Sequence, residues 1–249
     1  RFIEDGYGKH IYISKENIKA LENKQTVTET EKQKILLKIF ILQAAINKQF
    51  EEIRKISNNL YHKPLLLTLV NSVNIDDSDL ELFFKEIEKI AIGRGNDEIL
   101  KIAKEEISKE LSSETAKFEF EENKLHQNLN NIIQSISYSD ILHFVFNASS
   151  TGKIEVLKIS SNKQELVFKL ATSDRPFALM KIGDITEWIK NKLSNYEIIE
   201  KFDNESIFKN INNNEDISIL MGSRSFYEGW DSNRPNIILF INIGKGTDA

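Results

Sequence analysis

Cysteine is absent from this chain of 249 residues, and its absence excludes two kinds of structure at once. Without thiols there is neither a disulfide framework nor a thiolate metal site. No apolar run reaches the roughly 18 residues that a membrane-spanning helix needs. The first residues also lack the apolar stretch of a signal peptide. Together these absences predict a cytoplasmic protein that makes no membrane contact.

An excess of positive charge is missing as well. The formal net charge is -5, so the chain is not a general electrostatic binder of nucleic acid, and any such contact needs a local patch. Hydrophobic residues at 40% and charged residues at 29% are ordinary for a globular protein and permit a sizeable core. The length fits one large domain or two small ones.

Several catalytic motifs are absent. There is no G-x-x-x-x-G-K-[ST] P-loop, and Gly244-Lys245-Gly246-Thr247 has its first glycine in the wrong place. There is no Walker B motif of the Asp-Glu-x-His type and no nucleophile elbow. Metal-ligand spacing is also missing from the four histidines, which are His10, His62, His126 and His143.

One short match to nuclease chemistry exists. Glu122-Asn123-Lys124 fits the Glu-x-Lys end of a restriction-nuclease motif, but no strand with an Asp precedes it. A nuclease fragment is therefore an alternative with little support from the sequence.

Short apolar runs of β-branched composition predict strands buried on both faces, as in a parallel sheet. They occur early, at 64–70, and late, at 196–199, 217–221 and 237–243. Residues 9–14 predict a further strand near the start. Amphipathic periodicity predicts helices over 28–58, 139–147 and 184–193, and a helix that opens within 76–79 and runs to 93, with a short helix near Ile207 and Phe208.

The middle of the chain has a different texture. Residues 153–159 and 165–170 predict a β-hairpin, and 177–182 a third strand. We therefore expect an α/β domain formed by 59–92 and 183–249, interrupted by an insertion over 93–182 and preceded by a strand and a long connecting helix in 1–58. We also expect the chain to be a piece of a larger polypeptide, with this domain incomplete at its C-terminus.

A polar loop between the strands at 217–221 and 237–243 predicts a site, because open α/β sheets bind ligands where parallel strands end. Its sequence resembles motif V of superfamily two helicases, and more narrowly the Res subunits of type III restriction enzymes. The matching residues are Gly222-Ser223 and Glu228-Gly229-Trp230-Asp231. Residues 63–73 resemble motif IV, which opens the second RecA-like domain. The resemblance implies a RecA-like parallel sheet flanked by helices, interrupted by a helical plus β-hairpin insertion.

The resemblance also implies roles for individual residues. Glu228, Gly229 and Asp231 match positions that face the nucleotide; Asp can accept hydrogen bonds from ribose hydroxyls, and Gly permits close backbone approach. Ser223 matches a hydroxyl that binds a nucleic-acid phosphate, and Arg224 would add charge beside it. The motif IV phosphate contact corresponds to Asn71 and Ser72. We expect Asn71, Ser223 and Asp231 to lie at one edge of the sheet.

For the full-length protein, the resemblance implies ATP and Mg²⁺ as cofactors and DNA as a partner. It further implies a first RecA-like domain in the same polypeptide and a methyltransferase subunit beside it. Phosphoryl transfer needs a phosphate cradle, a Mg²⁺ ligand and an arginine together. We therefore expect this chain alone to bind no cofactor and to hydrolyse no ATP. The alternative from another class is a non-enzymatic α/β interaction module.

Overall fold

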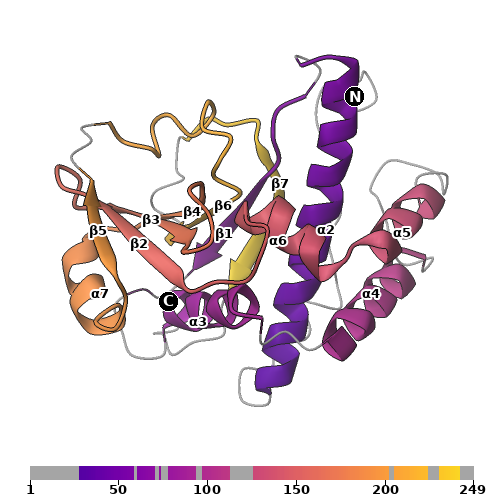
Figure 1. Ribbon diagram of the computed structural model, residues 1–249, viewed down its shortest axis with the longest axis horizontal. Helices are drawn as coiled ribbons and strands as arrows, with labels where there is room; N and C mark the ends of the chain where they lie inside the picture. Colours follow the sequence, from indigo (N-terminus) through magenta and orange to yellow (C-terminus); the bar gives the residue numbers. More distant parts are fainter. Residues whose placement is uncertain are drawn as a thin grey trace.

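A seven-stranded sheet forms the centre of the structure, a computed structural model that describes residues 28–58, 61–70, 73, 78–93, 97–112, 126–201, 205–223 and 230–241 (Figure 1). The strand order is β5-β2-β3-β4-β6-β1-β7. Neighbouring strands are parallel except at β3, which is antiparallel to both β2 and β4. The strands are β1 (Leu65–Val70), β2 (Ile154–Ile159), β3 (Glu165–Leu170), β4 (Pro176–Lys181), β5 (Ile198–Lys201), β6 (Ile219–Ser223) and β7 (Pro235–Ile241).

The strands predicted to be buried and parallel are parallel to their neighbours, but β5 and β7 are the edge strands and are only partly buried, so the prediction of burial on both faces is wrong for these two. β1 lies between β6 and β7 and is parallel to both, with Leu67 opposite Leu220 on one side and Ile238 on the other. β1 and β6 are buried over nearly their whole length, which explains their apolar sequences. The α/β architecture with a mostly parallel sheet is thus confirmed. The strand predicted at 9–14 lies outside the described residues.

The predicted β-hairpin is also confirmed, since β2 and β3 pair antiparallel and β4 adds the third strand. These strands belong to the segment 93–182, yet β4 pairs directly with β6 and β2 with β5. The segment therefore shares one continuous sheet with the residues on either side of it. No break in the sheet falls at the predicted boundary between 182 and 183.

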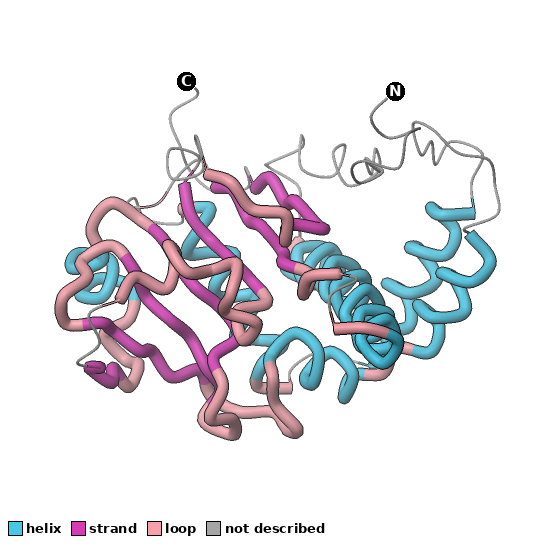
Figure 2. Tube along the Cα trace, turned by 90° about the horizontal axis from the view of Figure 1, so that it is seen from above, coloured by secondary structure: helices cyan, strands magenta, loops and turns pink. Residues whose placement is uncertain are grey.

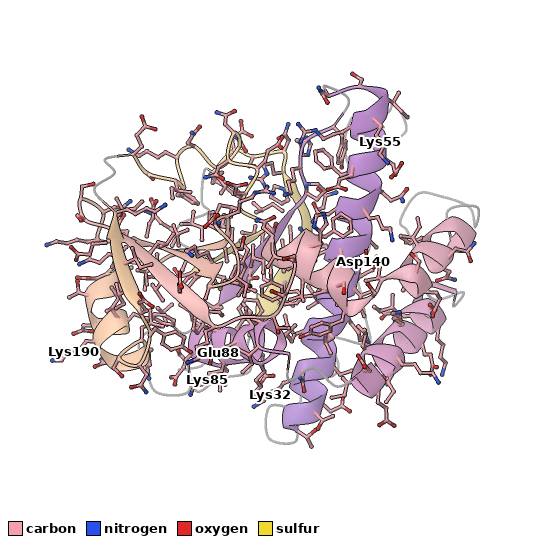
Figure 3. The ribbon with its side chains drawn as sticks, in the orientation of Figure 1. Lys32, Lys55, Lys85, Glu88, Asp140 and Lys190 are labelled. Carbon is pink, nitrogen blue, oxygen red and sulfur yellow. The ribbon has the colours of Figure 1, made fainter. Side chains whose placement is uncertain are left out.

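The helices predicted over 28–58 and 184–193 are present with ends close to those predicted, and the helix predicted from Ser139 begins at Tyr138, after the cap Ser137. Thr28, Ser78 and Ser137 each accept a hydrogen bond from a backbone N–H of the first turn, and Ser137 forms a capping box with Asp140. Figure 3 labels Asp140, which lies in the first turn of its helix. The expected short helix near 207 is instead a run of turns over 207–213. The helices are α2 (Glu29–Ile56), α3 (Asp79–Ala91), α4 (Asp97–Ser112), α5 (His126–Ser135), α6 (Tyr138–Phe146) and α7 (Ile185–Lys192).

The two faces of the sheet are covered differently. One face packs against α2, α3, α6 and α7 in a large core cluster, to which α2 contributes fully buried side chains such as Phe40 and Ala44. The other face carries a smaller cluster that includes Leu67, Leu179 and Leu220. Among the described residues this second face is covered by the turns of 205–217 and by Trp230, and we call it the open face.

Helices α4 and α5 lie on the far side of α2 from the sheet (Figures 1 and 2). Lys34 and Lys38 of α2 form ion pairs with Glu106 of α4 at 2.8 and 3.2 Å, respectively. The helix predicted to connect is therefore packed between two layers and belongs to the same core as the sheet. None of the described helices is both long and apolar enough to cross a membrane.

Candidate functional site

The loop that follows β6 carries most of the residues predicted to form a site. Ser223 is the last residue of β6 and lies beside Val70, the last residue of β1. The two strands thus end together at the carboxyl edge of the sheet, where the predicted contacts with nucleic acid begin. Asn71, Ser72, Arg224, Glu228 and Gly229 lie outside the described residues.

Asp231 does not lie beside Ser223. Its carbonyl oxygen accepts a hydrogen bond from Asn212 Nδ2 at 3.3 Å, and Arg234 a little further on donates to the carbonyl of Lys63, which precedes β1. Asp231 is therefore at the amino edge of the sheet, because the chain must return there before β7 can run parallel to β1. The expectation of one shared edge is wrong for this pair.

Trp230 lies on the open face of the sheet, where it packs against the smaller core cluster. Its ring stacks on Phe208 with 5.7 Å between the centroids and 25° between the planes. Both side chains pack against the smaller core cluster. Trp230 therefore serves as a packing anchor on this face.

Glu165 holds the turn that carries Phe208. The carboxylate is fully buried at the start of β3, and it accepts hydrogen bonds from Ser206 Oγ at 2.6 Å and from the backbone N–H groups of Ile207 and Phe208 at 3.0 and 3.3 Å. Lys181 Nζ of β4 lies 3.4 Å from the same carboxylate and 5.5 Å from the centre of the Phe208 ring. A buried charge satisfied in this way fixes the turn against the carboxyl edge.

Arg234 performs the corresponding role at the amino edge. Its guanidinium group is 1% exposed and donates to the backbone carbonyls of Lys63, Ile211, Asn214 and Ile217 at 2.9, 2.5, 2.7 and 2.6 Å. Burial lowers the pKa of this group from 12.5 to about 10, while the negative charge of Glu215 acts in the opposite direction. The segments before β1, β6 and β7 are thereby tied to one side chain.

Lys63 lies in a cationic part of the same edge. The pKa of its ammonium group is lowered from 10.5 to about 8, mainly by burial and to a smaller extent by repulsion from Arg175 and Arg234. Asp216 and Glu215 oppose this shift, and each also forms an ion pair with an arginine, Asp216 with Arg175 at 2.7 Å and Glu215 with Arg54 at 2.6 Å. Two of the arginines near this edge, Arg175 and Arg54, are therefore each paired with a carboxylate.

Metal chemistry finds no support in the part of the chain that the structure describes, where no group of three or more His, Asp or Glu side chains could hold an ion. His143 is exposed, with its Nε2 3.8 Å from Glu51 Oε1. His62 stacks on Tyr61 with 4.6 Å between the ring centroids. The nuclease-like segment 122–124 lies outside the described residues. His10 and the side chain of His126 do so too.

No protein-family model, curated protein or solved structure matches this chain. The site must therefore be argued from its own residues. Sequence reasoning missed Glu165 and Arg234, the two side chains that hold the open face together. Each is a single charge next to a strongly apolar strand, and that contrast is the one signal that could have pointed to them.

Proposed function

We propose that this chain is part of an ATP-dependent DNA helicase or translocase similar to the Res subunit of type III restriction enzymes. In this proposal it contributes half of an ATP site and part of a DNA track. ATP and Mg²⁺ would be held together with a first RecA-like domain of the full-length protein. The protein would act in the cytoplasm beside a methyltransferase subunit.

The observation that carries the proposal is the register of β6 and β1. Ser223 and Val70 are direct neighbours, so the loops that begin after these strands leave the sheet side by side. Open α/β sheets bind ligands at such carboxyl edges. A hydroxyl and backbone N–H groups in this position suit a phosphate oxygen. The two stretches that resemble motifs IV and V thus start from adjacent points.

The proposed nucleotide contact, Asp231, lies at a different place on the sheet from Ser223. Asp231 is exposed and lies toward the amino edge, so the loop from 223 to 231 would serve DNA at its first residue and nucleotide at its last. The proposed DNA contact and the proposed nucleotide contact are thus separated along the strand direction, in which each residue of a strand adds about 3.3 Å. One loop could then respond to both ligands.

Binding of DNA by the purified chain tests the proposal. Ser223→Ala should weaken binding of a fluorescently labelled duplex, measured by fluorescence anisotropy at low and at moderate salt, by about fivefold to tenfold, as expected for one lost phosphate hydrogen bond of about 1–1.5 kcal/mol. Ser150→Ala is the control for loss of a serine hydroxyl away from the site, because Ser150 is exposed and lies in the loop between α6 and β2, whereas Ser223 is half-buried at the end of β6. Absence of DNA binding, or equal affinities of the two variants, would refute the proposal.

One observation favours the alternative of an interaction module. Ile238 and Phe240, on the same face of the edge strand β7, are each 54% exposed. Exposed apolar side chains next to each other are typical of contact surfaces. If the chain binds no DNA, light scattering combined with Ile238→Lys would show whether this surface drives association of the chain with itself.

A further inference from the structure

We propose that Glu165 is a positioning residue for the loop after β6: through the turn at 206–212 it sets where Trp230 and Asp231 lie on the open face. The importance of that position for nucleotide rests on the proposed function. The mechanical link itself stands on contacts between described residues.

The first step of the link is the buried carboxylate. Both oxygens of Glu165 are used: Oε1 accepts from Ser206 Oγ and Lys181 Nζ, and Oε2 accepts from the N–H groups of Ile207 and Phe208. Ser206 Oγ also accepts from the N–H of Lys209 at 3.2 Å, so the same anchor caps the following turn. Hydrogen bonds to a charged acceptor are stronger than neutral ones, and this acceptor is fully buried.

The second step joins this turn to the loop after β6 at two places. The Phe208 ring stacks on Trp230, and Asn212 holds the following residues. Asn212 Nδ2 donates to the Asp231 carbonyl at 3.3 Å, while Asn212 Oδ1 accepts from Ser232 Oγ at 2.5 Å. A shift of the turn must therefore move Trp230 and Asp231 as well.

The third step is the direction of the link. Glu165 lies at the carboxyl edge beside Lys181, and Lys181 is opposite Gly222, the residue before Ser223. Asp231 lies at the other edge. The turn anchored by Glu165 thus connects the edge that bears Ser223 with the residue predicted to face nucleotide. A change on one side has a physical path to the other through packed side chains.

Quenching of tryptophan fluorescence by acrylamide tests the proposal. The chain has two tryptophans; Trp188 is 2% exposed, so quenching reports mainly on Trp230, and Trp230→Phe should remove the quenchable component. Glu165→Gln should raise the quenching constant about twofold at temperatures far below unfolding, because the turn loses its charged anchor and opens locally.

Glu155→Gln is the matched control, because Glu155 forms a cross-strand pair with Lys169 at 2.6 Å, just as Glu165 is opposite Lys181. Both variants should lose thermal stability, but only Glu165→Gln should change the quenching of the folded protein. Equal quenching in the two variants would overturn the proposal.

Two further variants keep the test decisive if Glu165→Gln fails to fold. Ser206→Ala removes one hydrogen bond to Glu165 and should raise quenching by a smaller factor, and Phe208→Leu should raise it where Phe208→Tyr does not. A quenching constant that stays unchanged in both Ser206→Ala and Phe208→Leu would refute the link. Since quenching needs neither DNA nor nucleotide, a negative result here differs from a failure of Ser223→Ala to weaken DNA binding.

Discussion

Removal of the buried guanidinium group of Arg234 should destabilise the chain more than loss of any exposed ion pair. Arg234→Ala removes the guanidinium donor from four backbone carbonyls, those of Lys63, Ile211, Asn214 and Ile217. The carbonyl of Ile211 keeps a hydrogen bond from the N–H of Asn214 at 3.3 Å. The four carbonyls belong to the segments that precede β1 and β6 and to the turn over the open face. The variant therefore loosens three parts of the amino edge together.

The magnitude follows from two opposing contributions. Hydrogen bonds from a charged donor are worth about 1.5–3 kcal/mol each, or roughly 6–12 kcal/mol for the set before any cost is subtracted. The lowering of the Arg234 pKa from 12.5 to about 10 reflects mainly burial. At about 1.4 kcal/mol for each pKa unit, the corresponding cost is about 3.5 kcal/mol. Because water can reach some carbonyls after truncation, we expect a net loss near the lower end, about 3–5 kcal/mol.

Urea unfolding followed by circular dichroism measures this loss. Arg175→Ala is the control: its guanidinium pairs with Asp216 at 2.7 Å, but the two side chains are 55% and 40% exposed, so its removal should cost less than about 1 kcal/mol. The loss of stability in Arg234→Lys should lie between the losses in Arg234→Ala and Arg175→Ala, because one ammonium group cannot donate to all four carbonyls around the guanidinium. A loss for Arg234→Ala no larger than that for Arg175→Ala would refute the reasoning.

Two further residues, Asn147 and Lys63, test the same edge. Asn147 ends α6 in the left-handed region at φ 53° and donates to the carbonyls of Pro176 and Asp216, both at 2.6 Å, so Asn147→Gly should cost about 1–3 kcal/mol and Asn147→Ala about 1 kcal/mol more in urea unfolding. Equal losses would argue against backbone strain at this cap. Lys63 has a folded-state pKa of about 8 against 10.5, so the unfolded chain binds more protons between these values and stability should rise from pH 8 to pH 10. This rise, measured by urea unfolding at each pH, should be absent in Lys63→Met and kept in a Lys158→Met control; an equal rise in all three proteins would exclude Lys63 as its source.

Much of the fold could be predicted because apolar runs carry the signal of burial. β1 and β6 are apolar at nearly every position since both of their faces are covered, and a parallel sheet requires that. The hairpin of β2 and β3 was equally visible, because its strands flank a polar turn at 160–164. These signals are local, so neighbouring residues are enough to read them.

The position of the hairpin within the sheet could not be predicted in the same way. β4 pairs with β6 although the two are distant in the chain, and nothing in the sequence of β4 specifies that partner. Pairing between distant strands depends on how whole faces fit together, which local periodicity does not record. For the same reason the amino-edge position of Asp231 was missed: motif spacing gives the order of residues but not the path of the chain between strands.

The open face shows why single charged side chains can matter more here than apolar ones. On the opposite face, helices such as α3 and α7 satisfy their own backbone groups and need only apolar contact with the sheet. The turns over 205–217 satisfy some of their own backbone groups, for example where the N–H of Asn210 donates to the carbonyl of Ile207, but others take their partners from side chains. Glu165 supplies acceptors at one end and Arg234 supplies donors at the other, each from a fully buried position. The two variants should therefore differ in kind: Arg234→Ala should lower global stability, while Glu165→Gln should expose Trp230 in a chain that remains folded.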